Sequence, residues 1–238
     1  MSAHEDLIEA IKDAPRRKGT VAFFDLDRTL IADYSGLGLL REQLAGKQLS
    51  MLDALQLAVV AATAARGRLA FEDAMGASAM MLEGQSEQAM RELAQRAFRK
   101  HWHAAIYPEG YDLVLAHRQR GHRIAIVSSA TRYQIEPIAS ELGIQDIVCT
   151  ELEVADGRFT GALQGRPCWG AQKLEAARRY LEQHKLAARS AWFYTDAHED
   201  LPLLEQVGHP VALNPDAKLT TVARRRGWPS ARFTSRTR

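Results

Sequence analysis

Cysteine is scarce in this chain: Cys149 and Cys168 are the only two among its 238 residues. Two cysteines can form at most one disulfide, which excludes a small disulfide-held scaffold and favours a reducing compartment. Long apolar runs are also lacking, because the longest covers residues 57–62, far short of the roughly 20 residues that span a membrane. The N-terminus has neither a basic start nor an apolar signal core. We therefore expect a cytoplasmic protein with no transmembrane segment.

Internal repeats and low-complexity segments are absent as well, and the composition is ordinary for a globular protein, with 46% hydrophobic and 25% charged residues. The net charge is only +2, but residues 224–238 contain six arginines and no acidic residue. A basic segment of this kind can bind nucleic acid or anionic lipid. Chain ends are also commonly loose and solvated. We expect no nucleic-acid partner and assign no role to this C-terminal tail.

Two aspartates follow directly after an apolar run near the N-terminus. Residues 21–24 read Val-Ala-Phe-Phe, and Asp25 and Asp27 come next. Such a run is typical of a buried strand in a parallel sheet. Because alternate residues of an extended chain point the same way, both carboxylates can converge at the carboxyl edge of the sheet, where open α/β sheets bind ligands. Paired carboxylates suit a hard cation such as Mg²⁺.

Three further polar groups follow strand or helix patterns along the chain. The apolar run 124–127 leads into Ser128 and Ser129. Lys173 lies at the start of a helical pattern. A third run, residues 191–195, leads into Asp196 and, four residues later, Asp200. Each of these groups stands where a strand ends or a helix begins, so the fold can bring them to one edge of the sheet.

Taken in order, these groups resemble the four motifs of the haloacid dehalogenase superfamily, closest to its subfamily IB and to phosphoserine phosphatase. The resemblance covers about residues 20 to 215. It implies a Mg²⁺-dependent phosphatase that hydrolyses a small organic phosphomonoester, of the phosphoserine or histidinol phosphate class, through an aspartyl-phosphate. The residues that carry it are Asp25, Asp27 and Thr29, then Ser128, then Lys173, then Asp196 and Asp200.

The chemistry assigns a role to each group. Asp25 would attack phosphorus, because a carboxylate is ionised at neutral pH and needs no base. Asp27 would protonate the leaving oxygen and then deprotonate water. Lys173 would offset the negative charge and, with Ser128 or Ser129, bind the phosphate. The resemblance adds Mg²⁺ ligands and supporting residues. The ligands are the carboxylates of Asp25 and Asp196 and the backbone carbonyl of Asp27, and the supporting residues are Thr29 and Asp200.

Residues 33–105 show no convincing strand. Helical patterns begin at Ser50 and Ser86, each with a capping serine followed by spaced apolar residues. After residue 106, strands and helices alternate, which predicts an α/β fold with a mostly parallel, Rossmann-like sheet and flanking helices. We therefore expect a core of residues 1–32 and 106–238, and an inserted all-helical cap of residues 33–105 that resembles the caps of the superfamily.

The later elements have their own signals. A helix over 108–120 would begin with a proline, and an Asp156-Gly157 turn predicts a hairpin. Pro137 should kink the helix that ends near residue 143 or mark its beginning.

Substrate specificity depends on residues that depart from the resemblance. Phosphoserine phosphatases usually have a Glu nine residues after the nucleophile, and here that position is Tyr34, with Asp33 beside it. We therefore expect phosphoserine to be a mediocre substrate. Arg28 and Arg132 lie close to the motifs, and either could bind an anionic substrate. Glu199 also stands where the superfamily often has Asn.

Three alternatives remain open on these residues. The aspartyl-phosphate could pass to an alcohol, which would make the chain a phosphotransferase. The chain could be a phosphate-binding regulator without turnover, although the complete set of charged motif residues favours an enzyme. The arginine tail could also direct a phosphatase to lipid or nucleic acid.

Overall fold

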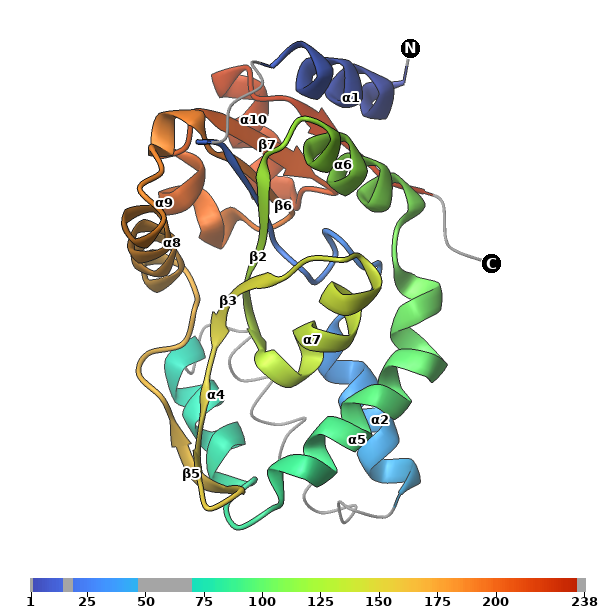
Figure 1. Ribbon diagram of the computed structural model, residues 1–238, viewed down its shortest axis with the longest axis vertical. Helices are drawn as coiled ribbons and strands as arrows, with labels where there is room; N and C mark the ends of the chain where they lie inside the picture. Colours follow the sequence, from blue (N-terminus) through green and yellow to red (C-terminus); the bar gives the residue numbers. More distant parts are fainter. Residues whose placement is uncertain (1, 15–18, 47–69, 235–238) are drawn as a thin grey trace.

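A six-stranded sheet forms the centre of the molecule in this computed structural model, which describes residues 2–14, 19–46 and 70–234 (Figure 1). The strands are β1 (Val21–Phe24), β2 (Arg123–Thr131), β3 (Asp146–Thr150), β6 (Trp192–Thr195), β7 (His209–Leu213) and β8 (Ser230–Ala231). Their order across the sheet is β3-β2-β1-β6-β7-β8, and every neighbouring pair is parallel. The predicted α/β fold with a parallel Rossmann-like sheet is confirmed.

Helices cover both faces of this sheet. The helices are α1 (Ala3–Asp13), α6 (Pro108–Gln119) and α7 (Arg132–Glu141) on one face, and α8 (Ala171–Gln183), α9 (Leu201–Leu204) and α10 (Ala217–Arg226) on the other. Alternate residues of β1 serve the two faces: Ala22 and Phe24 pack with the first group of helices, whereas Val21 and Phe23 pack with the second. A strand buried on both faces must be apolar throughout, which is why β1 reads as an unbroken apolar run.

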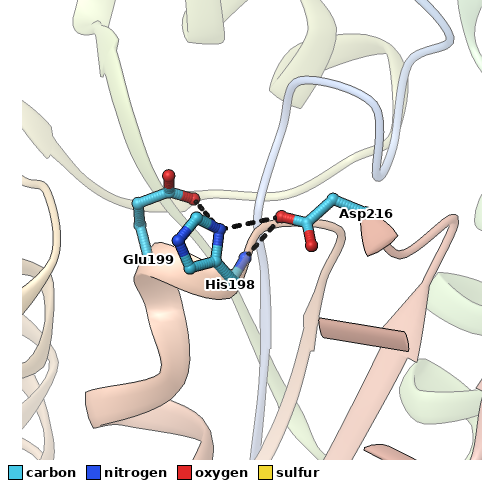
Figure 2. A group of neighbouring side chains, drawn as sticks. All are labelled: His198, Glu199 and Asp216. Carbon is cyan, nitrogen blue, oxygen red and sulfur yellow. Dashed lines mark hydrogen bonds and ion pairs between the residues drawn. The ribbon is translucent and has the colours of Figure 1, made fainter. Parts of the chain in front are cut away.

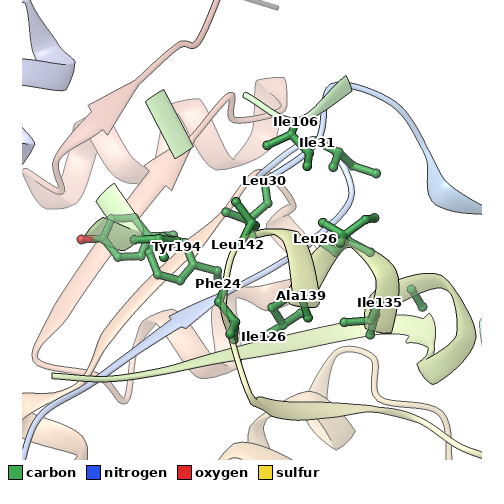
Figure 3. Close-up of a cluster of buried hydrophobic side chains, with 14 of the residues drawn as sticks. Phe24, Leu26, Leu30, Ile31, Ile106, Ile126, Ile135, Ala139, Leu142 and Tyr194 are labelled. Carbon is green, nitrogen blue, oxygen red and sulfur yellow. The ribbon is translucent and has the colours of Figure 1, made fainter. Parts of the chain in front are cut away.

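The core beneath α6 joins an aromatic stack to a buried hydrogen bond. The rings of Phe24 and Tyr194 are stacked with their centroids 4.5 Å apart, and Figure 3 shows them beside Ile126 and Leu142. The Tyr194 hydroxyl lies 2.8 Å from Nε2 of His117. Each large apolar side chain buried here stabilises the fold by about 1.5–3 kcal/mol. This packing holds β1 and β6 side by side at the centre of the sheet.

The described part of residues 33–105 is helical. Its α-helices are α2 (Ser35–Ala45), α4 (Phe71–Met80) and α5 (Glu87–Ala97), followed by a π-helical turn (Phe98–Trp102) and a 3-10 turn (His103–Ala105). They gather at the end of the molecule away from α1 and α10 (Figure 1). Ser86 caps α5, as predicted, by accepting a hydrogen bond from the Ala89 N–H at 3.4 Å. The helix predicted to begin at Ser50 lies outside the described residues.

A glycine allows α2 to pack against the end of α5. Trp102 is buried, and a Cβ added to Gly38 would lie only 2.2 Å from its Nε1. Any side chain at position 38 would therefore push the indole away. This close contact joins α2 and the π-helical turn after α5 into one packed unit.

A two-stranded hairpin after β3 joins this helical segment. The hairpin consists of β4 (Leu152–Ala155) and β5 (Arg158–Leu163), paired antiparallel around the predicted Asp156-Gly157 turn. The Phe159 N–H donates to the Gln85 carbonyl at 3.0 Å, and the Gly84 N–H donates to the Phe159 carbonyl at 2.9 Å. Figure 1 shows β5 beside α4. A segment from the second half of the chain therefore supports the helices of the first half.

Two elements differ in detail from the sequence-based expectation. Pro137 lies inside α7 and does not begin it: the helix starts at Arg132, where Thr131 and Gln134 form a capping box. The predicted helix 108–120 ends at Gln119, and its proline is the first helical residue as expected. In the part of the chain that the structure describes, no helix is both long and apolar enough to cross a membrane.

The arginine-rich C-terminal segment is partly built into the fold. Arg224, Arg225 and Arg226 form the last turn of α10, where positive charge complements the helix dipole. Arg226 pairs with Glu205, and Arg232 donates to the Pro215 carbonyl at 2.8 Å. Four of the six tail arginines thus belong to the described fold. The remaining two, at positions 236 and 238, lie outside the described residues.

Candidate active site

The carboxyl ends of the two central strands bring the first and last motifs together. Asp25 follows β1, and its N–H donates to the Tyr194 carbonyl at 2.9 Å, which extends the pairing of β1 with β6. Asp196 follows β6. Both carboxylates are buried. The pairing of parallel strands therefore places the two aspartates, 171 residues apart in the numbering, at one edge of the sheet.

A buried ammonium group links two of the carboxylates. Lys173, in the first turn of α8, donates to Oδ1 of Asp25 at 3.0 Å and to Oδ2 of Asp200 at 2.7 Å. The Thr195 hydroxyl also donates to Oδ2 of Asp200, at 2.6 Å. These four side chains are almost inaccessible to solvent. We call Asp25, Lys173, Thr195 and Asp200 the floor of the site.

Burial and charge act in opposite directions on the floor. Burial raises the pKa of Asp25, and Lys173 counteracts part of this shift. Burial alone would lower the pKa of Lys173, but the carboxylates of Asp200 and Asp25 outweigh it and raise that pKa above its usual value. Lys173 is therefore cationic at neutral pH, and its charge favours the ionised form of the buried Asp25 carboxylate.

Asp27 is held by an uncharged relay of hydrogen bonds. The Ser35 N–H donates to Oδ1 of Asp27 at 2.8 Å, and Gln134 donates to the Ser35 hydroxyl at 3.0 Å. The side-chain oxygen of Gln134 accepts from the Thr131 N–H at 2.7 Å. Burial raises the pKa of Asp27 to about 7, against the opposing effect of the Ser35 hydrogen bond. Near neutral pH, Asp27 can therefore hold a proton or release it.

The serines and the threonine predicted at this edge differ in exposure. Ser128 is buried, and its oxygen accepts from the Ala130 N–H at 3.3 Å. Ser129 is half-buried, and its carbonyl accepts from the Thr150 hydroxyl at 2.8 Å. Thr29 is fully buried, and its hydroxyl has no hydrogen-bond partner among the described residues. Both serines belong to β2, which continues to Thr131, so the strand extends past the predicted phosphate contacts.

The two predicted arginines have different partners. Nε of Arg28 lies 3.1 Å from Oδ2 of Asp196, and its guanidinium lies 5.9 Å from the centre of the Tyr34 ring. Arg132 instead forms a bidentate ion pair with Glu151. Its guanidinium is therefore already neutralised by the protein, and of the two arginines only Arg28 touches a motif carboxylate.

Arg28, Asp33 and Tyr34 form what we call the rim of the site. Asp33 and Tyr34 are exposed, and the Arg28 side chain is 42% accessible. Burial raises the pKa of Asp196, beside the rim, to about 8, and the charge of Asp25 adds to this shift, whereas Arg28 opposes it. The arginine thus supplies only part of the positive charge that an ionised Asp196 needs.

A cluster on the far side of Asp196 holds its loop in place. His198 lies between two carboxylates, with Nδ1 3.0 Å from Asp216 and 3.1 Å from Glu199 (Figure 2). The Asp216 N–H donates to the Asp196 carbonyl at 2.9 Å. Its carboxylate accepts from the His198 N–H at 3.0 Å and from the first turn of α10. Because Asp216 is hydrogen-bonded both to His198 and to the Asp196 carbonyl, the cluster serves as a clamp on the Asp196 loop.

The donor set and charge balance of the site fit Mg²⁺. Four carboxylates gather here against two cationic side chains, and two of the carboxylates have strongly raised pKa values. Burial is the largest cause of both shifts, and a cation beside such buried carboxylates would stabilise their ionised forms. Carboxylate and carbonyl oxygens are the ligands that Mg²⁺ prefers. The carboxylates are those of Asp25, Asp27, Asp196 and Asp200, and the cations are Lys173 and Arg28.

Sequence reasoning missed the residues that position the motif side chains. Ser35 and Gln134 hold Asp27, Asp216 holds the Asp196 loop, and Asn214 binds the Arg28 carbonyl. Two of them carried a local signal: Gln134 stands three residues after Thr131, as in a capping box, and Asp216 precedes a helical run. Their contacts with the site span up to 186 residues, which no local pattern can reveal.

Comparison with known proteins agrees with this geometry. A family model described as haloacid dehalogenase-like hydrolase matches residues 22–205. A histidinol-phosphatase from Neisseria meningitidis is 36% identical over 132 residues, which cover 54% of this chain and 60% of that protein. A phosphoserine phosphatase from Mycobacterium tuberculosis is 30% identical over 214 residues, which cover 87% of this chain and 68% of that protein.

A solved structure extends the agreement to the whole fold. A protein of unknown function from Bordetella pertussis matches with a TM-score of 0.82 and 28% sequence identity, covering 89% of this chain and 97% of that one. The family match spans all four motifs, from Asp25 to Asp200. The chain therefore belongs to the haloacid dehalogenase-like hydrolases, and within them it is similar to the phosphoserine phosphatases and histidinol-phosphatases.

Proposed function

We propose that this chain hydrolyses a small organic phosphomonoester through an aspartyl-phosphate on Asp25, with Mg²⁺ as its cofactor. The observation that carries the proposal is the buried contact of Asp25 with Lys173 and Asp200, with Asp27 held separately by Ser35. Membership of the family and the similarity to two phosphatases support phosphoric monoester hydrolysis as the reaction.

Asp25 is the proposed nucleophile. Lys173 occupies its Oδ1, which leaves Oδ2 to attack phosphorus. As the new Oδ2–phosphorus bond forms, the bond from phosphorus to the leaving oxygen breaks. Lys173 keeps Asp25 ionised and orients it, and its charge also favours binding of a phosphate dianion. Ser128 and Ser129, in the neighbouring strand β2, are the proposed hydrogen-bond partners of the phosphate.

Asp27 is the proposed general acid and base. Because the Ser35 N–H binds Oδ1, the proton resides on Oδ2, from which it passes to the leaving alcohol oxygen. The ionised Asp27 then removes a proton from water as that water attacks phosphorus, and the bond to Asp25 breaks to release phosphate. A pKa near 7 suits both halves of this cycle, since the group must give and take the same proton.

The Mg²⁺ site is proposed at the carboxylates of Asp25 and Asp196 and the backbone carbonyl of Asp27. Mg²⁺ bound there would supply positive charge against the phosphate oxygens. The clamp of His198 and Asp216 would keep the Asp196 loop in position. Asp200, which accepts from the Thr195 hydroxyl, and the buried Thr29 are the proposed supporting residues.

Residues 33–105 are the proposed cap, and residues 1–32 and 106–238 the proposed core. The close contact of Gly38 with Trp102 supports a cap that moves as one packed unit. The β4–β5 hairpin supports it from below through its backbone hydrogen bonds with residues 84–87. A cap that excludes water would strengthen every electrostatic contact on the phosphate.

The proposed substrates are small phosphate esters of the kind named for the two relatives. One is a phosphoserine phosphatase and the other a histidinol-phosphatase. Phosphoserine and histidinol phosphate are both phosphate esters of a small alcohol that carries an amino group. A leaving group of that size is small enough for a site closed by a cap.

Metal removal tests the proposal. Release of inorganic phosphate from a panel of phosphomonoesters should stop in excess chelator and return on addition of Mg²⁺. Ca²⁺ should restore little activity, because its larger and looser coordination sphere disturbs the in-line geometry. Parallel assays with candidate alcohols would reveal a phosphotransferase as an alcohol-dependent loss of free phosphate. Full activity in chelator would remove the metal from the mechanism, and no turnover of any ester with Mg²⁺ present would favour a binding protein.

A further inference from the structure

Arg28 has a backbone conformation that side-chain-bearing residues rarely adopt. It lies between Asp27 and Thr29 of the first motif with a φ of 59°, in the left-handed region. The Asn214 side-chain amide donates to its carbonyl at 2.8 Å, and Asn214 is itself buried. A residue held in this strained form by a distant buried partner has its side chain aimed by the fold. The fold thereby fixes the backbone from which the Arg28 side chain extends to Asp196.

The guanidinium of Arg28 contacts a proposed metal ligand. Its Nε lies 3.1 Å from Oδ2 of Asp196, and its Cζ lies over the Tyr34 ring, 5.9 Å from the ring centre. The Arg28 side chain is 42% accessible, whereas that of Asp196 is 12% accessible. The arginine therefore reaches from solvent onto a buried carboxylate and covers it.

We propose that Arg28 is an exchangeable counterion: it pairs with Asp196 until Mg²⁺ binds that carboxylate, and it then binds a carboxylate on the leaving group of the substrate. This inference rests on the proposed function. It narrows the substrate class to phosphomonoesters that carry a carboxylate near the phosphate, as phosphoserine does and histidinol phosphate does not.

The exchange follows from the charges at the site. A divalent cation on Asp196 repels the guanidinium and removes its only ion-pair partner among the described residues. The accessible side chain is then an unpaired cation above the site, beside Tyr34. A guanidinium pairs with a carboxylate through two parallel hydrogen bonds, and in this structure Arg28 already contacts one. A carboxylate on the leaving group would restore the pairing that the metal removed.

Metal affinity tests the first half of the proposal without relying on turnover. Calorimetric titration of the full chain with Mg²⁺ should give tighter binding for Arg28→Gln than for the parent, by about two- to fivefold, the range of a partly exposed ion pair. Arg28→Lys, which keeps the charge, should stay close to the parent. The matched control is Arg132→Gln, which removes the same charge from a guanidinium that pairs with Glu151.

Ligand binding tests the second half. Phosphoserine and phosphoethanolamine differ only in one carboxylate. Calorimetry of both on the Mg²⁺-loaded Asp27→Asn chain, which keeps the proposed Mg²⁺ ligands and lacks the general acid, therefore measures that group alone. With Arg28 present, phosphoserine should bind more tightly than phosphoethanolamine. Replacing Arg28 with Gln in that background should weaken phosphoserine binding about tenfold or more, as expected for a charge-assisted pair, and change phosphoethanolamine by less than about twofold.

The outcomes separate the two proposals. Equal tightening of Mg²⁺ binding by Arg28→Gln and Arg132→Gln would overturn the exchange. The effect would then come from the loss of one positive charge in general and not from the loss of the Arg28–Asp196 ion pair. Equal weakening of both esters, or binding of neither, would overturn Arg28 as the residue that binds the leaving-group carboxylate. Absence of turnover with these binding results intact would count against the proposed function alone.

Discussion

Asp25 and Arg28 stand three residues apart, yet their side chains depend on different kinds of neighbour. Asp25 belongs to the floor, where its neighbours are buried and charged: Lys173 lies at the start of α8, and Asp200 closes the 3-10 turn His198–Asp200. Arg28 belongs to the rim, where its partners are a half-exposed ring and a carboxylate that a metal could claim.

The two regions differ in how strongly neighbouring protein groups hold their side chains. Every floor residue is buried and has a charged or hydrogen-bonded partner, so a change there leaves a buried charge uncompensated. Rim residues face solvent, and their loss is partly compensated by water. We therefore expect the floor to determine whether a phosphate ester reacts at all, and the rim to determine which ester reacts best.

The largest effect should come from the proposed nucleophile. Asp25→Asn should lower phosphate release on the order of a thousandfold or more, as losing an essential nucleophile does, because an amide oxygen is a poor nucleophile. The near-isosteric change should preserve the fold, which circular dichroism would check. Asp13→Asn, on the exposed end of α1, is the matched control and should retain full activity. A variant rate above about one hundredth of the parent rate would show that Asp25 is not the nucleophile.

The second effect concerns the buried cation. Lys173→Met leaves the carboxylates of Asp25 and Asp200 buried without their shared partner, so the free energy of unfolding should fall by about 3–5 kcal/mol. Denaturant titration measures this. Lys12→Met removes an exposed lysine paired with Glu9 and should change stability by less than about 1 kcal/mol. If both variants were equally stable, the distinction between buried floor and solvated surface would fail.

The third effect tests the neutral relay that holds Asp27. Gln134→Leu should lower kcat about tenfold. This is less than the roughly 10²–10⁴-fold that a general acid or base contributes, because the variant loosens Ser35 and Asp27 but does not remove them. KM should change little. Gln134→Glu keeps an oxygen to accept from the Thr131 N–H, so it separates loss of the α7 cap from loss of the relay. A Gln134→Leu enzyme with parent kcat would show that the relay does not position Asp27.

The smallest effect belongs to the rim. If the leaving group lies against Tyr34, phosphoserine should be outperformed by a carboxylate-bearing ester whose leaving group also carries a ring or an alkyl chain. Tyr34→Ala should then raise KM for that ester about three- to tenfold, the cost of losing part of an aromatic contact. A minimal aryl phosphate should be nearly unaffected. If phosphoserine leads the panel and Asp33→Asn selectively impairs it, Asp33 takes the role proposed here for Tyr34.

The sequence alone predicted the floor almost completely. Strand and helix patterns are local, so an apolar run followed by Asp25, or a helical pattern that begins near Lys173, can be recognised without the fold. Parallel pairing then brings strand ends to one edge. The positions of β1, β2, β3 and β6 and the hairpin turn followed for the same reason. The strands β7 and β8 were not predicted, because one contains a proline and the other has two residues.

Only the tertiary structure decided what surrounds the motif side chains. Asp27 depends on Gln134 through Ser35, 99 residues away from it in sequence, and Arg28 depends on Asn214 across 186 residues. The tertiary structure also distinguished the two arginines that the sequence left equivalent, because Glu151 neutralises Arg132 while Arg28 contacts Asp196. The physical reason is that residue type and spacing determine which groups reach the edge of the sheet. Long-range packing determines which of those groups are already paired and which remain available to a ligand.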